Sequence, residues 1–311
     1  MLDTGNPWQI KIHRAGGLAM DALRNANAGH VAAVFEHSFY IDTPAGLFCV
    51  GNERMYAGPL NVITAAPETT DWRASGLSCN LPVSLSARKL CVGPQLSFDL
   101  TDLKPWAPQR WPSPPAVINA ARGLSGFRAV ARAKVRTDGL GAFIFHDDSN
   151  TSSSPSGRLA GPAISGLRAT LRRTFQTGKP QMPECCDLET LMGIGPGLTP
   201  AGDDFLGGMM MALRALSFPV FCADLWAGIE PRAETAGNAV SLAHLRGAAE
   251  GYAAAAVHDL ILAILSGDVA AMPSAIEELD RIGHSSGWDI MAGAVTVIDA
   301  WLRASQPAPS N

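Results

Sequence analysis

The hydrophobic pattern of the chain changes between its two halves, and this change limits the fold more than any other feature. Up to about residue 145, short runs of β-branched and aromatic residues alternate with Pro- and Gly-containing turns, which predicts strands. After residue 157, Ala, Leu and Met dominate, and apolar residues recur at three- and four-residue spacing, which predicts helices. We therefore expect an α+β fold, with a mostly antiparallel, β-rich N-terminal region followed by an α-helical C-terminal bundle.

Individual elements follow from the same patterns. Two β-rich runs on either side of a Pro/Gly turn predict a hairpin in the first half. Strands are expected at 31–41, 47–50, 60–64, 81–85, 89–92 and 140–145, and helices at 13–27 and 117–135. In the second half, helices are expected at 158–177, 200–216, 221–228, 232–265 with a break near Gly247 or Gly251, 272–282 and 286–303.

A polar, Ser-rich segment at 147–157 has the composition of a linker. Residues 105–115 hold five prolines and form a stiff connector within the first half. We therefore predict a β-rich domain over residues 1–150 and a helical domain over residues 151–311.

The composition argues against several classes of protein. The net charge of −4 is unlike that of a general nucleic-acid binder, which needs a surplus of Lys and Arg. Polar residues interrupt the most apolar stretch, and no signal peptide is evident, so we expect neither a membrane span nor export. The six cysteines include no C-x-x-C pair or zinc-ligand cluster. We therefore expect a soluble, cytoplasmic protein with reduced thiols.

The most informative segment of the helical half is Gly193-Ile-Gly-Pro-Gly-Leu-Thr-Pro-Ala-Gly-Asp-Asp204. Its glycines predict a loop, and Thr199 followed by Pro200 predicts the N-cap and first residue of a helix. Amides at a helix start lack intrahelical partners and attract phosphate or carboxylate. We therefore predict an anion site whose binding residues include Gly195, Gly197, Thr199 and Gly202.

This loop matches neither of the common phosphate-binding motifs. It has no Gly-Lys-Ser/Thr, and Leu198 stands where the dinucleotide fingerprint has its third glycine. An ordinary capped helix would also explain Thr199, Pro200 and the acidic first turn. It explains less well why three glycines precede the cap, with Gly202 inside the first turn, where glycine costs about 1 kcal/mol.

A second loop, at residues 282–293, repeats this plan. The Gly-x-Asp-x-x-x-Gly pattern of residues 202–208 recurs at 287–293, again with a Ser-bearing loop before a predicted helix. We expect both helix starts to face one pocket, with the Cα atoms of Thr199 and Ser286 within about 15 Å. The alternative is that the two loops are independent helix caps and that the pattern recurs by chance.

The candidate residues take different roles. Successive helical positions point about 100° apart, so we assign Asp204, whose spacing matches Asp289, to the site. Asp203 would complement the helix dipole. His284 is the candidate proton carrier because histidine titrates near neutral pH, although a lone histidine is more often structural. The predicted catalytic residues are thus Asp204, His284 and Asp289, and further binding residues are Ser285, Ser286 and Gly287.

Two further features leave alternatives open. Asn238, Ser241 and Arg246 fall at helical spacing between the loops, where they form either a polar stripe at the site or a solvated face. Asp203 and Asp204 would repel a bare anion if they faced it. They could instead orient the loop, or hold a Mg²⁺ ion that bridges to the anion.

Residues 193–208 and 282–293 resemble a family first catalogued as a domain of unknown function and now labelled an oxamate carbamoyltransferase subunit family. The resemblance covers residues 185–300 well, and the N-terminal half only in general organisation. It implies one subunit of a multi-subunit enzyme of allantoin breakdown, a branch of purine catabolism. That enzyme interconverts oxalurate plus phosphate with oxamate plus carbamoyl phosphate. The chain does not resemble the ordinary carbamoyltransferase fold, and no catalytic residue is carried over from the family.

We therefore expect a subunit of a carbamoyltransferase-type enzyme that binds a small anionic metabolite and other subunits of the same enzyme. One alternative is a non-catalytic partner subunit whose glycine loops bind a regulatory ligand or a neighbouring chain. Another is a component of an ATP-dependent ligase, although neither loop contains a lysine.

Overall fold

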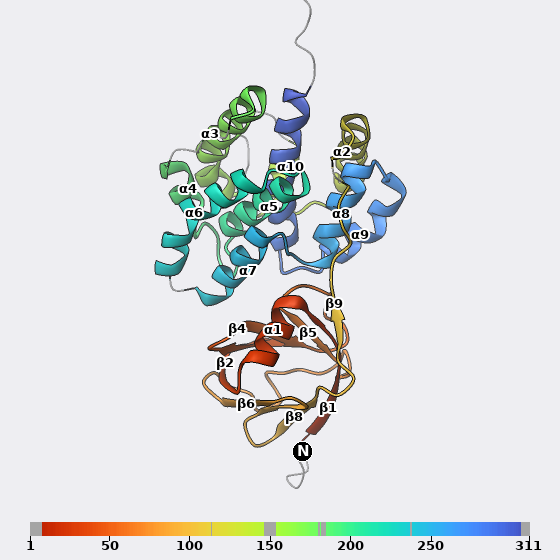
Figure 1. Ribbon diagram of the computed structural model, residues 1–311, viewed down its shortest axis with the longest axis vertical. Coiled ribbons are helices and arrows are strands. Elements are labelled where there is room, and N and C mark those ends of the chain that lie inside the picture. Colours follow the sequence, from red (N-terminus) through yellow and green to blue (C-terminus); the bar gives the residue numbers. More distant parts are fainter. Residues whose placement is uncertain are drawn as a thin grey trace, which may run out of the picture. The chain divides into compact units, whose positions relative to one another are not determined.

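The computed structural model describes residues 8–305 except 113, 146–153, 180, 182–184 and 237 (Figure 1). These residues form two compact units, which divide between Pro108 and Gln109. The first unit is rich in strands and the second is helical, which confirms the α+β class.

The N-terminal unit is a mixed β-barrel. Its elements are β1 (Trp8–Gly16), α1 (Gly17–Asn25), β2 (Ala28–Val34), β3 (Ser38–Thr43), β4 (Gly46–Gly51), β5 (Asn61–Thr64), β6 (Pro82–Ser86), β7 (Lys89–Val92), β8 (Leu96–Asp99) and β9 (Lys104–Trp106). The strand order is β5-β4-β3-β2-β6-β7-β8-β1-β9, and pairing of β1 with β5 closes the sheet. Most neighbouring strands are antiparallel, as predicted, and the parallel pairs are β1–β8, β1–β9 and β4–β5.

Alternating burial along the strands fills this barrel with apolar side chains. Every second residue of β3 and β6 is buried, as the two-residue period of a strand requires. Phe39, Trp72 and Phe98 are fully buried and contact one another, with ring centroids 5.1 to 6.2 Å apart. The aromatic cluster is therefore a structural core.

The structure corrects two elements expected in this unit. The helix predicted at 13–27 is wrong in its first turn, because β1 continues to Gly16. That glycine is packed so tightly that a Cβ would lie 2.0 Å from the carbonyl oxygen of Gly58. The strand predicted at 31–41 is two strands, β2 and β3, which a tight turn joins. β1, β8 and β9 were not predicted as strands.

The helical unit contains all the helices expected in the second half of the chain. Its elements are α2 (Val117–Ala131), η1 (Gly141–Ile144), α3 (Pro155–Thr177), α4 (Cys185–Leu191), α5 (Ala201–Ala215), α6 (Pro219–Thr235), α7 (Ala239–Glu250), α8 (Ala255–Ser266), η2 (Val269–Ala271), α9 (Met272–Leu279) and α10 (Ser286–Ala304). The long helix expected at 232–265 breaks at Gly251, whose φ is 92°. Its predicted start is wrong, because α6 continues to Thr235 and α7 begins at Ala239. Only α4 and the two short 3₁₀ turns were not predicted.

The segment 140–145 was expected to be a strand, and this prediction is wrong. It contains η1, whose apolar residues are buried against α10. The preceding helix, α2, packs on α8 and α9. Because both elements pack among helices, they belong to the second unit, and the division falls at residue 108 rather than in the Ser-rich segment. Residues 146–153 of that segment lie outside the described part of the chain.

Helices α5 and α10 lie side by side at the centre of this unit (Figure 1), and most of their residues are buried. A Cβ on Gly208 would lie 1.8 Å from the carbonyl oxygen of Ile290, and a Cβ on Gly293 would lie 1.9 Å from that of Phe205. The two contacts are reciprocal. Ile290 lies 85 positions after Phe205, and Gly293 lies 85 positions after Gly208, so each glycine meets the equivalent carbonyl group of the other helix. Both N-termini lie at the same end, because the hydroxyl oxygens of Thr199, just before α5, and Ser286, the first residue of α10, are 3.0 Å apart. The two helices therefore run in the same direction.

One stretch of the described chain, Ala239–Ser266, is long and apolar enough to cross a membrane, but 61% of its most apolar window is buried inside the structure. Such burial is typical of a core helix in a soluble protein. Cys49, Cys79, Cys91 and Cys222 are free thiols. The side chains of Cys185 and Cys186 lie outside the described part of the structure.

The glycine contact between α5 and α10 predicts a sharp difference between two adjacent substitutions. Gly208→Ala places a methyl group against the backbone of α10 and should lower the free energy of unfolding by roughly 3 kcal/mol. Gly207→Ala should be neutral or stabilising, because its Cβ would meet Ala248 at an ordinary 3.7 Å and alanine favours a helix. Urea unfolding of both variants checks this, and equal losses of stability would contradict the close packing.

Candidate functional site

The first loop, residues 193–200, ends at the start of α5. Its three glycines have φ angles of 76°, 104° and 100°, which L side chains rarely adopt, and this explains why they are glycine. The helix begins at Ala201 with Pro200 as its N-cap, and no side chain caps it. The predicted capping by Thr199 is therefore wrong. Its hydroxyl group is directed to the second loop instead.

Asp203 fastens the first loop to α5 and α7. Its carboxylate accepts hydrogen bonds from the backbone amide of Gly193 at 2.7 Å and from the hydroxyl of Ser241 at 2.5 Å. The side chain is only 7% exposed. Asp203 lies in the first turn, so its charge does complement the helix dipole. Its contacts also give it a structural role that the sequence did not indicate.

Asn238 makes a second connection to the same loop. It caps α7 by accepting from the amide of Ser241, and its Nδ2 donates to the carbonyl of Leu198 at 2.7 Å. Two of the three residues considered as a polar stripe, Asn238 and Ser241, therefore support the candidate site. The third, Arg246, forms ion pairs with glutamates of α6 instead.

The second loop, residues 283–285, leads into α10. The hydroxyl of Ser285 donates to Oδ2 of Asp289 at 2.8 Å. The other oxygen of Asp289 accepts from the backbone amide of Leu140 at 2.5 Å. Asp289 is 1% exposed, so its carboxylate lies in the interior with donors on both oxygens.

The two loops face each other, as their shared pattern predicted. Oγ1 of Thr199 and Oγ of Ser286 lie 3.0 Å apart, within hydrogen-bond distance. Since each oxygen is only two bonds from its Cα atom, the two Cα atoms lie well within the expected 15 Å or so. Both hydroxyl groups also lie close enough to the carboxyl group of Asp204 to lower its pKa. Three polar side chains thus meet where two parallel helices begin.

Asp204 is the least satisfied polar group at this junction. It is 7% exposed, and its Oδ2 has no hydrogen-bond partner within the described residues. Burial raises the pKa of Asp204 well above its usual 3.8, and the negative charges of Asp289 and Asp203 raise it further, against the opposing effect of the Ser and Thr hydroxyls. A buried carboxyl group of this kind favours its neutral form, which can donate a hydrogen bond.

Asp289 differs from Asp204 in what stabilises its ionised form. Burial raises the pKa of Asp289 to about 6, while the Leu140 amide and the Ser285 hydroxyl act in the opposite direction. Asp204 has only hydroxyl donors and lies beside other carboxylates. Near the two helix starts, Asp204 thus favours its protonated form, whereas Asp289 releases its proton more readily. Two carboxyl groups that differ in this way suit acid–base chemistry.

Gly202 and Gly287 belong to the framework of the two loops. The amide of Gly202 donates to the carbonyl of Ile194, and that of Gly287 donates to Ile282. A Cβ at either position would lie 1.7 or 2.4 Å from a carbonyl oxygen of the preceding helix. These two glycines therefore let each helix start close to its preceding turn, and their amides are already engaged.

The amides of Gly195, Gly197 and Thr199 are different. Within the part of the chain that the structure describes, these amides donate to no protein acceptor. Gly197 is exposed and the other two residues are half-buried. These N–H groups are therefore accessible to a ligand or to water.

His284 lies at the outer edge of the second loop, with its side chain 75% exposed. Its ring contacts the carboxylate of Asp138 and lies 3.3 Å from Nη1 of Arg136. It is not enclosed together with Asp204. The structure connects it to the segment 136–141, which the sequence analysis did not assign to the site.

The segment 136–141 completes the surroundings of Asp289. A Cβ on Gly139 would lie 2.4 Å from Oδ1 of Asp289, so this glycine lets the backbone approach the carboxylate. The Asp138-Gly139 pair is a turn signal that could have drawn attention to the segment. Among the described residues, no group of three or more His, Cys, Asp or Glu side chains is placed to hold a metal ion.

The contacts of Asp203 predict a larger effect on stability than a surface charge would have. Asp203→Asn removes the charge and one acceptor from two buried hydrogen bonds, and should lower the free energy of unfolding by about 2 kcal/mol. The interaction of this charge with the helix dipole alone would account for only about 0.3–1 kcal/mol. Asp204→Asn should cost little, since its carboxyl group already favours the neutral form. Urea unfolding of both variants measures these losses of stability. A greater loss of stability for Asp204→Asn than for Asp203→Asn would show that the two roles are reversed.

Asp289 predicts a pH dependence of stability. Because its pKa is about 6 in the fold against 3.8 ordinarily, the folded state binds the proton more tightly. The stabilisation that this protonated carboxyl group contributes is complete below pH 3.8 and is lost as the pH rises to 6. The free energy of unfolding should fall by about 3 kcal/mol over this range. Asp289→Asn should flatten the fall in stability across this window. Glu250→Gln, at an exposed position of α7, should keep the wild-type slope, and an unchanged slope in both would refute the assignment.

Two family models match the chain. The model described as oxamate carbamoyltransferase subunit AllH matches residues 191–298, which include both loops and α5. The model described as the AllH family N-terminal domain matches residues 11–105, which lie in the barrel unit. No solved structure matches the chain significantly. Since the two models together cover most of the sequence, the chain belongs to the oxamate carbamoyltransferase subunit AllH family.

Proposed function

We propose that the paired helix starts form the small-anion site of a carbamoyltransferase-type enzyme of which this chain is one subunit. The family supports the transferase subunit. The observation that carries the anion site is the buried, unpartnered Oδ2 of Asp204, at the junction where Thr199 meets Ser286. The proposed ligands are the small anions of the family reaction: oxamate or oxalurate, and phosphate or carbamoyl phosphate.

The raised pKa of Asp204 reconciles an anion with an acidic site. A neutral carboxyl group does not repel an anion and can donate a hydrogen bond to it. The amides of Gly195, Gly197 and Thr199 add donors, and the positive ends of two helix dipoles favour negative charge at the same place. An anion held in this way needs no lysine or arginine in either loop.

Proton transfer in this proposal uses the remaining polar groups. Asp204 is the acid, and Asp289, oriented by Ser285, is the base once the pH exceeds about 6. His284, exposed and in contact with Asp138, would exchange protons with solvent at the rim. Gly202 and Gly287 would act indirectly, by holding the loops in position.

The family description names a subunit, so the chain works with other subunits of the same enzyme. The proposed setting is the cytoplasm. If this chain only held the anion for a neighbouring subunit, the isolated chain would bind oxamate but would not convert oxalurate and phosphate. Assay of the chain alone and with its partner subunits separates these two versions.

Two substitutions at Asp204 test the proposed site. Asp204→Leu removes the donor without leaving a buried charge, and should weaken oxamate binding at least tenfold, or about 1.4 kcal/mol. Asp204→Asn retains a donor but cannot release a proton. It should bind oxamate nearly as well as wild type, with a strongly reduced kcat in the assembled enzyme. Calorimetry gives the affinity, and the phosphorolysis assay gives kcat.

Both variants should fold, because each replaces a carboxyl group that resists ionisation in the interior. Glu250→Gln, at an exposed position, is the control and should change neither quantity. Wild-type affinity for oxamate in Asp204→Leu would remove the anion site from the junction, whereas full activity in Asp204→Asn would remove Asp204 from proton transfer alone.

A further inference from the structure

Asp289, the base of the proposed function, has one side chain from which it can take a proton. At 1% exposed, its carboxylate has almost no surface that a ligand could contact. Its Oδ1 accepts from the Leu140 amide at 2.5 Å, and its Oδ2 accepts from the Ser285 hydroxyl at 2.8 Å. Within the part of the chain that the structure describes, Ser285 is the only side chain that donates to this carboxylate. Because backbone amides do not release their protons near neutral pH, the proton that Asp289 removes is that of Ser285.

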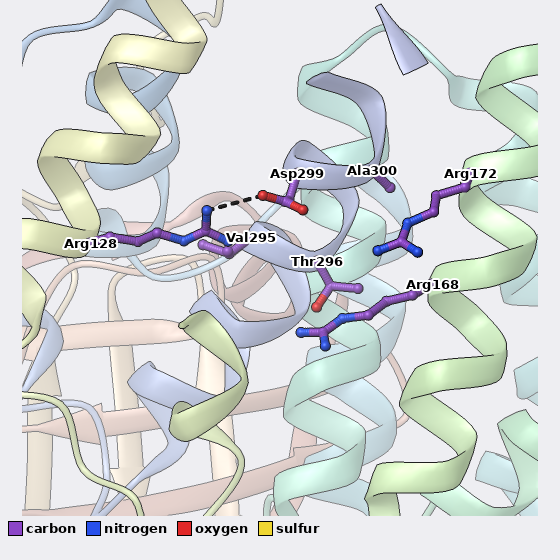
Figure 2. Close-up of a pocket in the computed structure, with 7 residues that line it drawn as sticks. All are labelled: Arg128, Arg168, Arg172, Val295, Thr296, Asp299 and Ala300. Atoms are coloured by element: carbon purple, nitrogen blue, oxygen red, sulfur yellow. Dashed lines mark ion pairs between the residues drawn. The ribbon is translucent and has the colours of Figure 1, made fainter. Parts of the chain in front are cut away.

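Asp289 differs in its partners from Asp299, the other acidic residue of α10. Asp299 forms ion pairs with Arg128 at 3.0 Å (Figure 2) and with Arg303 at 2.6 Å, and these pairs give it a structural role. Among the described residues, only neutral groups donate hydrogen bonds to Asp289. Burial raises the pKa of Asp289 to about 6, so its carboxylate can exchange a proton near neutral pH, as a general base must.

The hydroxyl group of Ser285 is accessible at the edge of the loop junction. Ser285 precedes the first residue of α10 and is half-buried. Its hydroxyl group does not cap the helix but is directed to Asp289. The next residue, Ser286, meets Thr199 of the first loop at 3.0 Å, so Ser285 adjoins the junction where Asp204 lies. The positive end of the α10 dipole favours the negative charge that develops on the Ser285 oxygen as its proton leaves.

We propose that Ser285 is the nucleophile of the carbamoyl transfer and carries the carbamoyl group between the two substrates. This role rests on the proposed function and adds the reacting atom to it. A serine hydroxyl is a weak nucleophile until a neighbouring base takes its proton. The usual arrangement has the base within hydrogen-bond distance and a third group that orients the base. Ser285, Asp289 and the Leu140 amide form such a set.

The reaction takes place in two balanced steps. In the first, Oγ of Ser285 attacks the carbamoyl carbon of oxalurate while Asp289 takes the hydroxyl proton. The bond from that carbon to the oxamate nitrogen breaks, and protonated Asp204 gives this nitrogen a proton. In the second, an oxygen of hydrogen phosphate attacks the carbamoyl carbon, the bond to Oγ breaks, and Asp289 returns its proton to Ser285. The proton of hydrogen phosphate restores Asp204, and carbamoyl phosphate leaves.

Isotope exchange in the assembled enzyme tests this proposal. With oxalurate and ¹³C-labelled oxamate but no phosphate, wild type should transfer the label into oxalurate, because departure of oxamate leaves the carbamoyl group on Ser285. Direct transfer of the carbamoyl group to phosphate would give no such exchange. Mass spectrometry of the enzyme after incubation with oxalurate should find an added carbamoyl group on the peptide that contains Ser285.

Three serine variants make the result specific. Ser285→Ala should lose both the exchange and the adduct, and should still bind oxamate. It should fold, because Ser285 makes no cap hydrogen bond. Ser285→Thr keeps a hydroxyl group and should retain the adduct, so it serves if Ser285→Ala does not fold. Ser274→Ala is the matched control, because the hydroxyl of this exposed residue of α9 donates to the carbonyl of Ala271, and it should behave as wild type.

Exchange that persists in Ser285→Ala would overturn the proposal, as would a wild type that carbamoylates phosphate without exchange or adduct. Loss of carbamoyl transfer in Ser285→Ala, with no exchange in wild type, would also overturn it and make Ser285 a proton relay to Asp289. All these results leave the proposed function in place if oxamate binding still depends on Asp204. Wild-type oxamate affinity in Asp204→Leu would instead reject the proposed anion site, and the role of Ser285 with it.

Discussion

The architecture of the candidate site depends on backbone contact between α5 and α10. Gly208 and Gly293 let each helix touch the carbonyl oxygens of the other, and the contacts are reciprocal. Such packing sets the register of the two helices as well as their separation. It therefore aligns their N-termini, and Thr199 meets Ser286 as a consequence. The polar site is thus positioned by apolar packing one to two turns away.

Once the two helices are aligned, electrostatics separates two carboxyl groups that look equivalent in sequence. Asp289 is surrounded by the Leu140 amide and the Ser285 hydroxyl, whereas Asp204 has hydroxyl partners only and lies beside other carboxylates. The pKa of Asp204 is consequently raised well above the usual range, and the neutral form is favoured. The proposed anion site rests on this difference, because a neutral carboxyl group does not repel an anion.

Sequence reasoning found the helices and the pairing of the loops because both depend on local periodicity and on a repeated spacing. It failed where contacts between distant segments determine the structure. The apolar run at 140–145 is equally compatible with a strand and with a buried turn, and only its packing on α10 distinguishes them. Asp203 and Asp204 are adjacent, so spacing could not show that Asp203 binds Gly193 and Ser241. The contact of Leu140 with Asp289 joins segments 149 positions apart and leaves no pattern in the sequence.

The protonation of Asp204 is the most direct test of this account, and ¹³C NMR of its side-chain carboxyl carbon can follow it across pH with and without oxamate. The account predicts that this carboxyl group titrates well above the usual range of an aspartate, and that its chemical shift changes when oxamate binds. An Asp204 that titrates in the usual range of an aspartate, and whose resonance does not respond to oxamate, would contradict it.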